Sequence, residues 1–203
     1  MIIEDATGKK NGLKVDDNNQ MHSFCVTESE KNAAVEDGYA FNINTGIIAL
    51  TGSNDSAILY LKNNESPLNG DSDLVIDTIV IGINTISATI TERPILTVVR
   101  NPTAGTIVSG ASTADMVSNA NFGSSNTLED SLIYKGADGN TITDGTDHAI
   151  VLCSEGRTTI PELNIDLPKG SSIGLKLDLN TSGGANVYAA IVCHRKDGNN
   201  SRS

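Results

Sequence analysis

The sequence predicts an all-β protein, an antiparallel β-sandwich, and two observations lead to this prediction. Short apolar runs rich in Ile, Val and Leu recur along most of the 203 residues, and residues of this kind favour strands. Between the runs lie clusters of Gly, Asn, Asp, Ser and Pro, which are typical of turns. A chain of this length can form one β-sandwich domain without dividing further.

The beginning of the chain, residues 1–20, differs in composition from the rest. It carries Lys, Asp, Asn and Gly with little periodicity, so it cannot bury enough apolar surface to form a core of its own. We therefore predict an extended N-terminal arm at 1–20 and a sandwich domain at 21–203. Such an arm becomes ordered only against another surface, either its own domain or a neighbouring subunit.

Twelve apolar runs mark the expected strands of the domain. In chain order they are 21–27, 39–44, 46–51, 57–62, 74–83, 95–100, 106–109, 132–135, 148–153, 159–167, 172–179 and 186–195. Two of them alternate strictly between apolar and other residues, which indicates a strand with one face in water. Their apolar rows are Tyr39, Phe41 and Ile43 in the first, and Ile173, Leu175, Leu177 and Leu179 in the second.

Turns and one short helix are expected between these strands. The tight turns are Asn44-Thr45-Gly46, Asp138-Gly139, Asp144-Gly145 and Ser182-Gly183-Gly184, where glycine accepts the positive φ that such turns need. Helical periodicity is limited to 28–38, which we expect to form about two turns that end at Gly38 as a C-terminal cap. A second short turn is possible at 112–117.

About a dozen strands with almost no helix leave a sandwich or a barrel, and we prefer a jelly roll. The longest loops are expected at 28–38, 63–73 and 110–131. Loops of this length in a compact domain are usually functional or interfacial. The loop at 110–131 is therefore the expected contributor to contacts with partners.

Acidic residues outnumber basic residues by 25 to 14, which gives a formal net charge of −11. Because this field repels phosphate backbones, we do not expect nucleic acid as a partner. The most basic part, His194 to Lys196 with Arg202, is too dispersed for such a site. No stretch approaches the roughly 18 to 20 apolar residues of a membrane span, and acids near the start leave no export signal visible.

The three cysteines, Cys25, Cys153 and Cys193, are odd in number and widely spaced. This pattern favours free thiols in a reducing cytosol over a disulfide framework. Each cysteine lies inside an apolar run, so we predict that each is buried as a small apolar residue.

No segment carries the motif of an enzyme in the context that the motif requires. Cys153 or Cys193 could pair with His148 or His194, but nucleophilic cysteines need accessible, electropositive surroundings. Cys193 and His194 are adjacent, so on a strand they face opposite ways and cannot easily share a metal ion. We expect His194 to be solvated at the end of its strand, and we predict no enzyme and no catalytic residue.

Two acidic segments could in principle bind calcium, which prefers oxygen ligands in flexible loops. The possible ligands are Asp138, Asn140, Asp144 and Asp147 in one segment and Asn69, Asp71 and Asp73 in the other. Neither segment has the spacing of an EF-hand, and the same residue types are common in β-turns. We therefore predict plain turns, with no metal and no cofactor.

Phe122 is the one aromatic residue that the sequence places within a long polar loop. Glycan-binding surfaces usually use aromatic platforms, and a chain without Trp and with few Tyr and Phe could offer only a thin one. We expect Phe122 to pack its own loop onto the core. Carboxylates for glycoside hydrolysis cannot be assigned from spacing, because tertiary structure places them.

Several segments resemble a group of virion structural proteins from environmental, largely marine, tailed phages. The segments that carry the resemblance are 26–46, 57–64, 100–110, 118–128, 134–141 and 167–182. The resemblance covers most of the chain after residue 25 and includes no catalytic signature. It implies a virion component that is made in the host cytoplasm and built into the particle.

The leading hypothesis is a capsid decoration, or cement, protein that acts as a homotrimer and bridges subunits of the major capsid protein or other virion proteins. An extended arm can pair with the sheet edge of a neighbour, and copies around a symmetry axis need heterologous contacts. The alternative is the receptor- or glycan-binding head of a tail or head fibre, although no stalk-forming heptads or repeats precede the domain. A hydrolase that acts on host polysaccharide is the third possibility.

Overall fold

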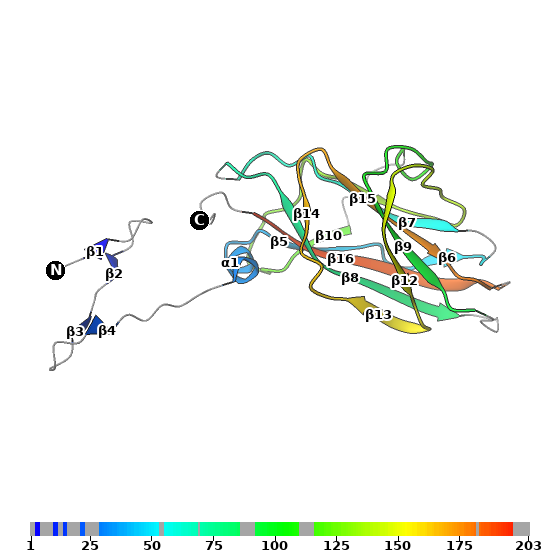
Figure 1. Ribbon diagram of the computed structural model, residues 1–203, viewed down its shortest axis with the longest axis horizontal. Helices are drawn as coiled ribbons and strands as arrows, with labels where there is room; N and C mark the ends of the chain where they lie inside the picture. Colours follow the sequence, from blue (N-terminus) through cyan, green and yellow to red (C-terminus); the bar gives the residue numbers. More distant parts are fainter. Residues whose placement is uncertain are drawn as a thin grey trace.

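The computed structural model has two antiparallel sheets packed face to face, which confirms the all-β sandwich (Figure 1). The described residues are 29–52, 55–68, 70–85, 92–109, 116–181 and 183–196, together with 3–4, 10–11, 14–15 and 21–22 near the start. No helix among these residues has the length and apolar character needed to cross a membrane.

The first sheet has seven strands in the order β10-β5-β16-β8-β13, with β14 also paired to β8 and β6 to β16. These strands are β5 (Ala40–Asn44), β6 (Ile48–Leu50), β8 (Leu74–Thr85), β10 (Val117–Asn119), β13 (Gly156–Ile160), β14 (Ile165–Leu167) and β16 (Ala185–Arg195). The two longest strands, β8 and β16, lie side by side at its centre. Both are rich in β-branched residues, which pack well on a pleated surface.

The second sheet has five strands in the order β11-β7-β15-β9-β12. They are β7 (Ser56–Lys62), β9 (Ile95–Arg100), β11 (Leu132–Lys135), β12 (Thr146–Leu152) and β15 (Ser172–Asp178). Its central strand β15 pairs with β7 on one side and β9 on the other. The strands at its two edges, β11 and β12, each pair with one neighbour.

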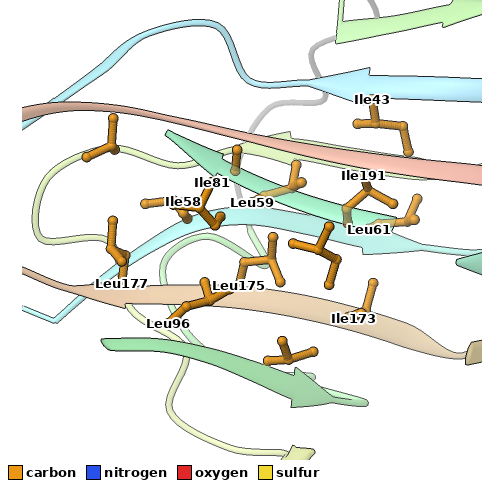
Figure 2. Close-up of a cluster of buried hydrophobic side chains, with 14 of the residues drawn as sticks. Ile43, Ile58, Leu59, Leu61, Ile81, Leu96, Ile173, Leu175, Leu177 and Ile191 are labelled. Atoms are coloured by element: carbon orange, nitrogen blue, oxygen red, sulfur yellow. The ribbon is translucent and has the colours of Figure 1, made fainter. Parts of the chain in front are cut away.

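The hydrophobic core lies between the two sheets, where aliphatic side chains from both interdigitate (Figure 2). The predicted apolar row of β15 is confirmed, because its members from Ile173 to Leu179 are all buried. Phe41 and Ile43 of β5 are buried as well. Tyr39 lies just before β5 and is half-buried, with the Arg195 guanidinium 5.8 Å from its ring centroid.

The predicted helix is confirmed as α1 (Glu30–Glu36), which packs beside β5 and β16 (Figure 1). Ser29 caps its first turn, since the Ser29 hydroxyl accepts a hydrogen bond from the Asn32 amide as N-cap residues do. Gly38 follows the helix with φ +77°, the conformation expected of a glycine just beyond a helix end.

Residues 101–145 connect two neighbouring strands, β9 and β12, by a long route. On the way they add β10 to one edge of the first sheet and β11 to one edge of the second. The same segment covers part of the outer face of the second sheet. There Ile107 is buried beside Tyr60 and Tyr134, whose rings stack with centroids 5.6 Å apart.

Three sequence predictions are wrong in detail. The run 106–109 is a turn rather than a strand, and its Ser109 hydroxyl donates to the Thr106 carbonyl. The expected loop 110–131 contains a strand, β10. The run 159–167 is divided into β13 and β14 because Pro161 lacks the N–H that a sheet ladder needs.

The turn at Asn44-Thr45-Gly46 is confirmed, with Gly46 at φ +62° and its amide bonded to the Asn44 side chain. Gly139 and Gly145 also have positive φ, as expected of the turns at Asp138-Gly139 and Asp144-Gly145. Ser182 lies outside the described residues, and so do 110–115, which include most of the possible turn at 112–117.

The residues described before Ser29 form four two-residue strands, namely β1 (Ile3–Glu4), β2 (Lys10–Asn11), β3 (Lys14–Val15) and β4 (Met21–His22). β1 pairs with β2 and β3 with β4. Most of the expected arm at 1–20, and most of the run 21–27, lie outside the described residues. The arm and its boundary with the domain therefore stay predictions.

Candidate functional site

One flank of the sandwich is formed by edge strands with exposed apolar side chains. β12 pairs with β9, and its other side has no strand partner in the part of the chain that the structure describes. Ile150 and Leu152 of β12 point outward and are 66% and 57% exposed, whereas Ala149 and Val151 pack against the core. An unpaired edge with apolar side chains is a typical site for contact with another chain.

A pocket of about 430 Å³ opens at this flank, between the start of β12, the end of β9 and β14. This volume is in the range of small-molecule sites. Most of its wall is aliphatic: the apolar lining residues are Val98, Val99, Leu163, Ile165, Leu167, Pro168 and Ile173.

Several polar groups in the pocket wall already have partners. The Ser172 amide donates to Asn101 Oδ1 at 3.0 Å, and the Ser172 hydroxyl donates to the Pro102 carbonyl at 2.9 Å. Asp166 is paired with Lys196 at 2.9 Å. Arg100 and His148 are exposed at the wall, and neither has an ion pair with a described residue. The pocket thus has an apolar interior, with the Arg100 and His148 side chains at its wall.

The backbone beside the pocket adopts a conformation that non-glycine residues rarely take. Asn101 has φ +50°, and the short link between β13 and β14 has Glu162 at +54° and Asn164 at +44°. A left-handed conformation of this kind costs about 1–3 kcal/mol per residue and persists only where the surrounding structure holds it. The strained link supplies Leu163 and Asn164 to the pocket wall.

Phe122 lies at the opposite flank and is 99% exposed, so the prediction that it packs onto the core is wrong. The reason is a compact turn that holds its neighbours. The Asn121 side chain donates to the Glu36 carbonyl at 3.0 Å and accepts from the Gly123 amide at 3.0 Å. The turn is therefore fixed to the end of α1, and the phenyl ring projects away from it.

Under α1 a buried contact between a histidine and an aspartate joins the two central strands of the first sheet. His194 Nδ1 of β16 lies 3.1 Å from Asp77 Oδ2 of β8, and Lys31 Nζ of α1 lies 3.8 Å from the same oxygen. His194 is 4% exposed, so the prediction of a solvated histidine is wrong. The prediction failed because the helix packs over this end of β16. His194 Nε2 has no hydrogen-bond partner among the residues that the structure describes.

A second buried acid, Glu65, fixes the loop before β11. Its Oε1 accepts hydrogen bonds from the Asp130 amide, the Ser131 amide and the Ser131 hydroxyl at 3.2, 3.0 and 2.8 Å. Its Oε2 lies 3.6 Å from Arg195 Nη1. Together with the pairs of His194 and Lys196, this contact ties each of the three basic residues at the end of β16 to a carboxylate.

The aspartate carboxylates of the acidic turns accept hydrogen bonds from amides and hydroxyls of neighbouring loops. Asp138 accepts from the amide and hydroxyl of Thr51, and Asp144 accepts from the Thr103 amide and hydroxyl and the Ala104 amide. The Thr103 hydroxyl and these amides lower the pKa of Asp144.

The other possible calcium ligands are placed as follows. Asn140 accepts from the Ala137 amide, and the Asp71 carboxylate accepts from the Asp73 amide. Asp147 is exposed on β12, and Asn69 lies outside the described residues. The described residues contain no group of three or more His, Cys, Asp or Glu that could hold a metal ion.

Cys153 and Cys193 are both free and buried, as predicted, whereas Cys25 lies outside the described residues. Burial raises the pKa of the Cys193 thiol strongly, and the charges of Asp77 and Glu65 add to this effect. Burial raises the pKa of Cys153 as well. His148 lies exposed at the start of β12, whereas both thiols are buried. Neither cysteine has the lowered pKa of a nucleophile.

Comparison with models of known protein families gave no match, and comparison with curated proteins gave none either.

Proposed function

We propose that the chain is a structural component of a phage virion, a capsid decoration protein with a jelly-roll domain. The observation that carries the proposal is the strand order. Without the two strands contributed by residues 101–145, and without the short strands β6 and β14, the sheets have the orders β5-β16-β8-β13 and β7-β15-β9-β12. All pairs are antiparallel.

The path of the chain through these strands supports a jelly roll. Among these eight strands, successive strands alternate between the two sheets, except for β9 and β12, which are neighbours in one sheet. This arrangement corresponds to two interlocked Greek keys of four strands each, and jelly rolls are the domains of many viral capsid proteins and lectins. Fold alone does not assign a function, so the resemblance of the sequence to phage virion proteins is the second support.

The proposed mechanism is mechanical: the protein adds contacts between neighbouring capsid subunits. The exposed edge of β12 offers unpaired backbone groups and two outward apolar side chains for such a contact. The arm at 1–20 would extend the reach of the domain to a neighbour. The free, buried thiols are consistent with assembly in the reducing cytoplasm of the host.

Removal of residues 1–20 tests this role. The shortened protein should keep its folded domain, which circular dichroism and thermal unfolding would report, and should lose binding to empty capsids of the parent phage in a co-sedimentation assay. Capsid binding at the affinity of the full chain would contradict the proposal. Full-length protein that does not bind capsids at all would contradict it as well.

The second candidate is a receptor- or glycan-binding head, and the pocket is the observation that favours it. Its volume suits a small ligand, and Arg100, His148 and Asn164 offer polar groups at its wall. Binding of the isolated protein to host cells, without affinity for empty capsids, would favour this function over decoration. Loss of cell binding on filling the pocket would then assign the site.

A further inference from the structure

Two features at opposite edges of the sandwich complement each other. One is the Phe122 turn, defined as residues 120–124, which follows β10 and presents a phenyl ring that is 99% exposed. The other is the pocket beside β14. In the first sheet β10 is the edge strand on one side, whereas β13 and β14 pair with β8 on the other. A bare aromatic ring and an apolar pocket therefore lie at opposite edges of the first sheet.

The two features also lie at the same height along the strands. One row of paired residues crosses the first sheet from edge to edge, through Asn119, Phe41, Cys193, Ile76 and Ile165. Asn119 is the last residue of β10, three residues before Phe122, and Ile165 lines the pocket. The ring and the pocket are thus placed at the two ends of one row.

This common height determines what kind of assembly such a contact would form. A contact between two different surfaces of identical copies is heterologous, and repetition gives either a closed ring or an open helix. A rise along the axis at each step produces the helix, whereas two surfaces at the same height allow the ring to close. Copies related by rotation about an axis parallel to the strands meet this condition.

The chemistry of the pocket suits an aromatic side chain. Its interior is aliphatic, and the polar groups of Asn101 and Ser172 are already bonded to their neighbours. A volume of about 430 Å³ accommodates a phenyl ring with part of the turn that carries it. Because the turn is fixed to α1 by Asn121, little conformational freedom would be lost when the ring is buried.

The charges around the two features are complementary as well. The Phe122 turn is attached to the end of α1, where Glu36 and Asp37 are exposed. At the pocket wall Asp166 is neutralised by Lys196. The ionisable groups that remain there are Arg100 and His148. The carboxylates of Glu36 and Asp37 beside the ring would therefore be attracted to the Arg100 guanidinium at the pocket wall.

We propose that Phe122 of one copy inserts into the pocket of the next copy, and that repetition of this contact closes a ring. The inference concerns the contact and does not depend on a virion role. The expectation of three copies comes from the sequence-based hypothesis of a homotrimeric capsid decoration protein.

Sedimentation velocity of the purified full-length chain tests the contact through two matched substitutions. Phe122→Ser should raise the dissociation constant of the assembly at least about 30-fold, as expected for an aromatic residue at the centre of an interface. Ile47→Ser is the control, since Ile47 is 70% exposed but lies in the turn at the other end of β5. It should leave the assembly unchanged. Equal effects of both substitutions, or none of Phe122→Ser, would overturn the proposal.

The pocket side is tested with Ser171→Trp, which fills the pocket from its wall. This variant should also dissociate the ring while its thermal unfolding stays cooperative. To avoid dependence on one bulky substitution, a photo-reactive benzoylphenylalanine at position 122 identifies the contact directly. Irradiation should link it to a second copy within 163–173. Links to another segment, links only within one chain, or no links between copies would contradict the proposal, whatever the outcome of the capsid-binding assay.

Discussion

β15 and β12 are strands of equal length in the same sheet, and both contain several aliphatic residues, yet their burial is opposite. β15 lies at the centre, and each of its aliphatic side chains is buried. β12 lies at the edge, with Ile150 and Leu152 largely exposed. The outer face of β15 is covered too, because Pro102 and Ile142 of the long connection pack over Gly174. No described residue pairs with the free edge of β12.

The difference shows that the apolar content of a strand does not determine its burial; the position of the strand in the sheet does. Burial on β15 serves stability. Exposed aliphatic residues on an edge strand are a liability unless another surface covers them. In the proposed function, the exposed residues of β12 are the ones that contact a neighbouring protein.

The largest difference in stability is expected between Leu175→Ala on β15 and Ile150→Ala on β12. Leu175 is completely buried, so its truncation should lower the free energy of unfolding by about 2–5 kcal/mol through lost burial and a cavity. Ile150→Ala should change it by less than about 0.5 kcal/mol, as at other surface positions. Urea unfolding followed by circular dichroism, with each protein dissociated to single chains, gives both values. Equal losses would contradict the account.

A smaller loss is expected when the cover over β15 is disturbed. A Cβ at position 174 would lie 2.4 Å from Ile142 Cδ1 and 3.2 Å from Pro102 Cγ, so Gly174→Ala should cost about 1–3 kcal/mol as an overpacked site. Ile142→Ala removes the nearer obstacle. In that background Gly174→Ala should cost clearly less, and the double-mutant cycle in urea measures the difference. Additive losses in the free energy of unfolding would mean that Ile142 does not limit the space at position 174.

A fall in pH should loosen the packing of the connection 101–145 over β15, because Asp144 becomes protonated. Hydrogen bonds from the Thr103 hydroxyl and nearby amides lower the pKa of Asp144 in the folded state. Its contribution to stability is therefore present above the unfolded pKa of about 3.9 and is lost as the pH falls through the lower folded pKa. Asp144→Asn should lose less stability than the native protein as thermal unfolding is followed from pH 5 towards pH 2. Parallel curves would exclude this role.

The smallest effect is expected for the reactivity of the thiols in the folded protein, because Cys153 and Cys193 are both buried in the sandwich. In a Cys25→Ser variant, Cys153 and Cys193 should not react with an aromatic disulfide reagent under native conditions, since burial raises the pKa of both thiols and only the thiolate reacts. Both should react in denaturant. Rapid reaction of either thiol in the folded protein would contradict its assigned burial.

The periodicity of the sequence predicted the central strands well, because alternation in β15 and long β-branched runs in β8 and β16 are imposed by burial. It also predicted α1 and its glycine cap, because helical periodicity and a terminal glycine are both visible in the local sequence. It did not predict that His194 is buried, because that depends on Asp77 and on a helix far away in the chain.

The pocket could not be predicted either, since its wall combines the ends of β9, β12 and β14 with the link between β13 and β14. The one local signal was Pro161, which breaks the run 159–167 just before the residues of the strained link. Phe122 was visible as an aromatic residue in a polar loop. Its exposure depends on the bond of Asn121 to α1, which sequence spacing does not show.

The central claim is that Phe122 of one copy and the pocket at the opposite edge of the next copy form a contact between copies of the chain. Native mass spectrometry of the purified full-length protein at micromolar concentration tests it most directly. The account predicts a single closed assembly with three times the 21.2 kDa mass of one chain, which Phe122→Ser converts to single chains. A native protein that shows only the mass of one chain would contradict it.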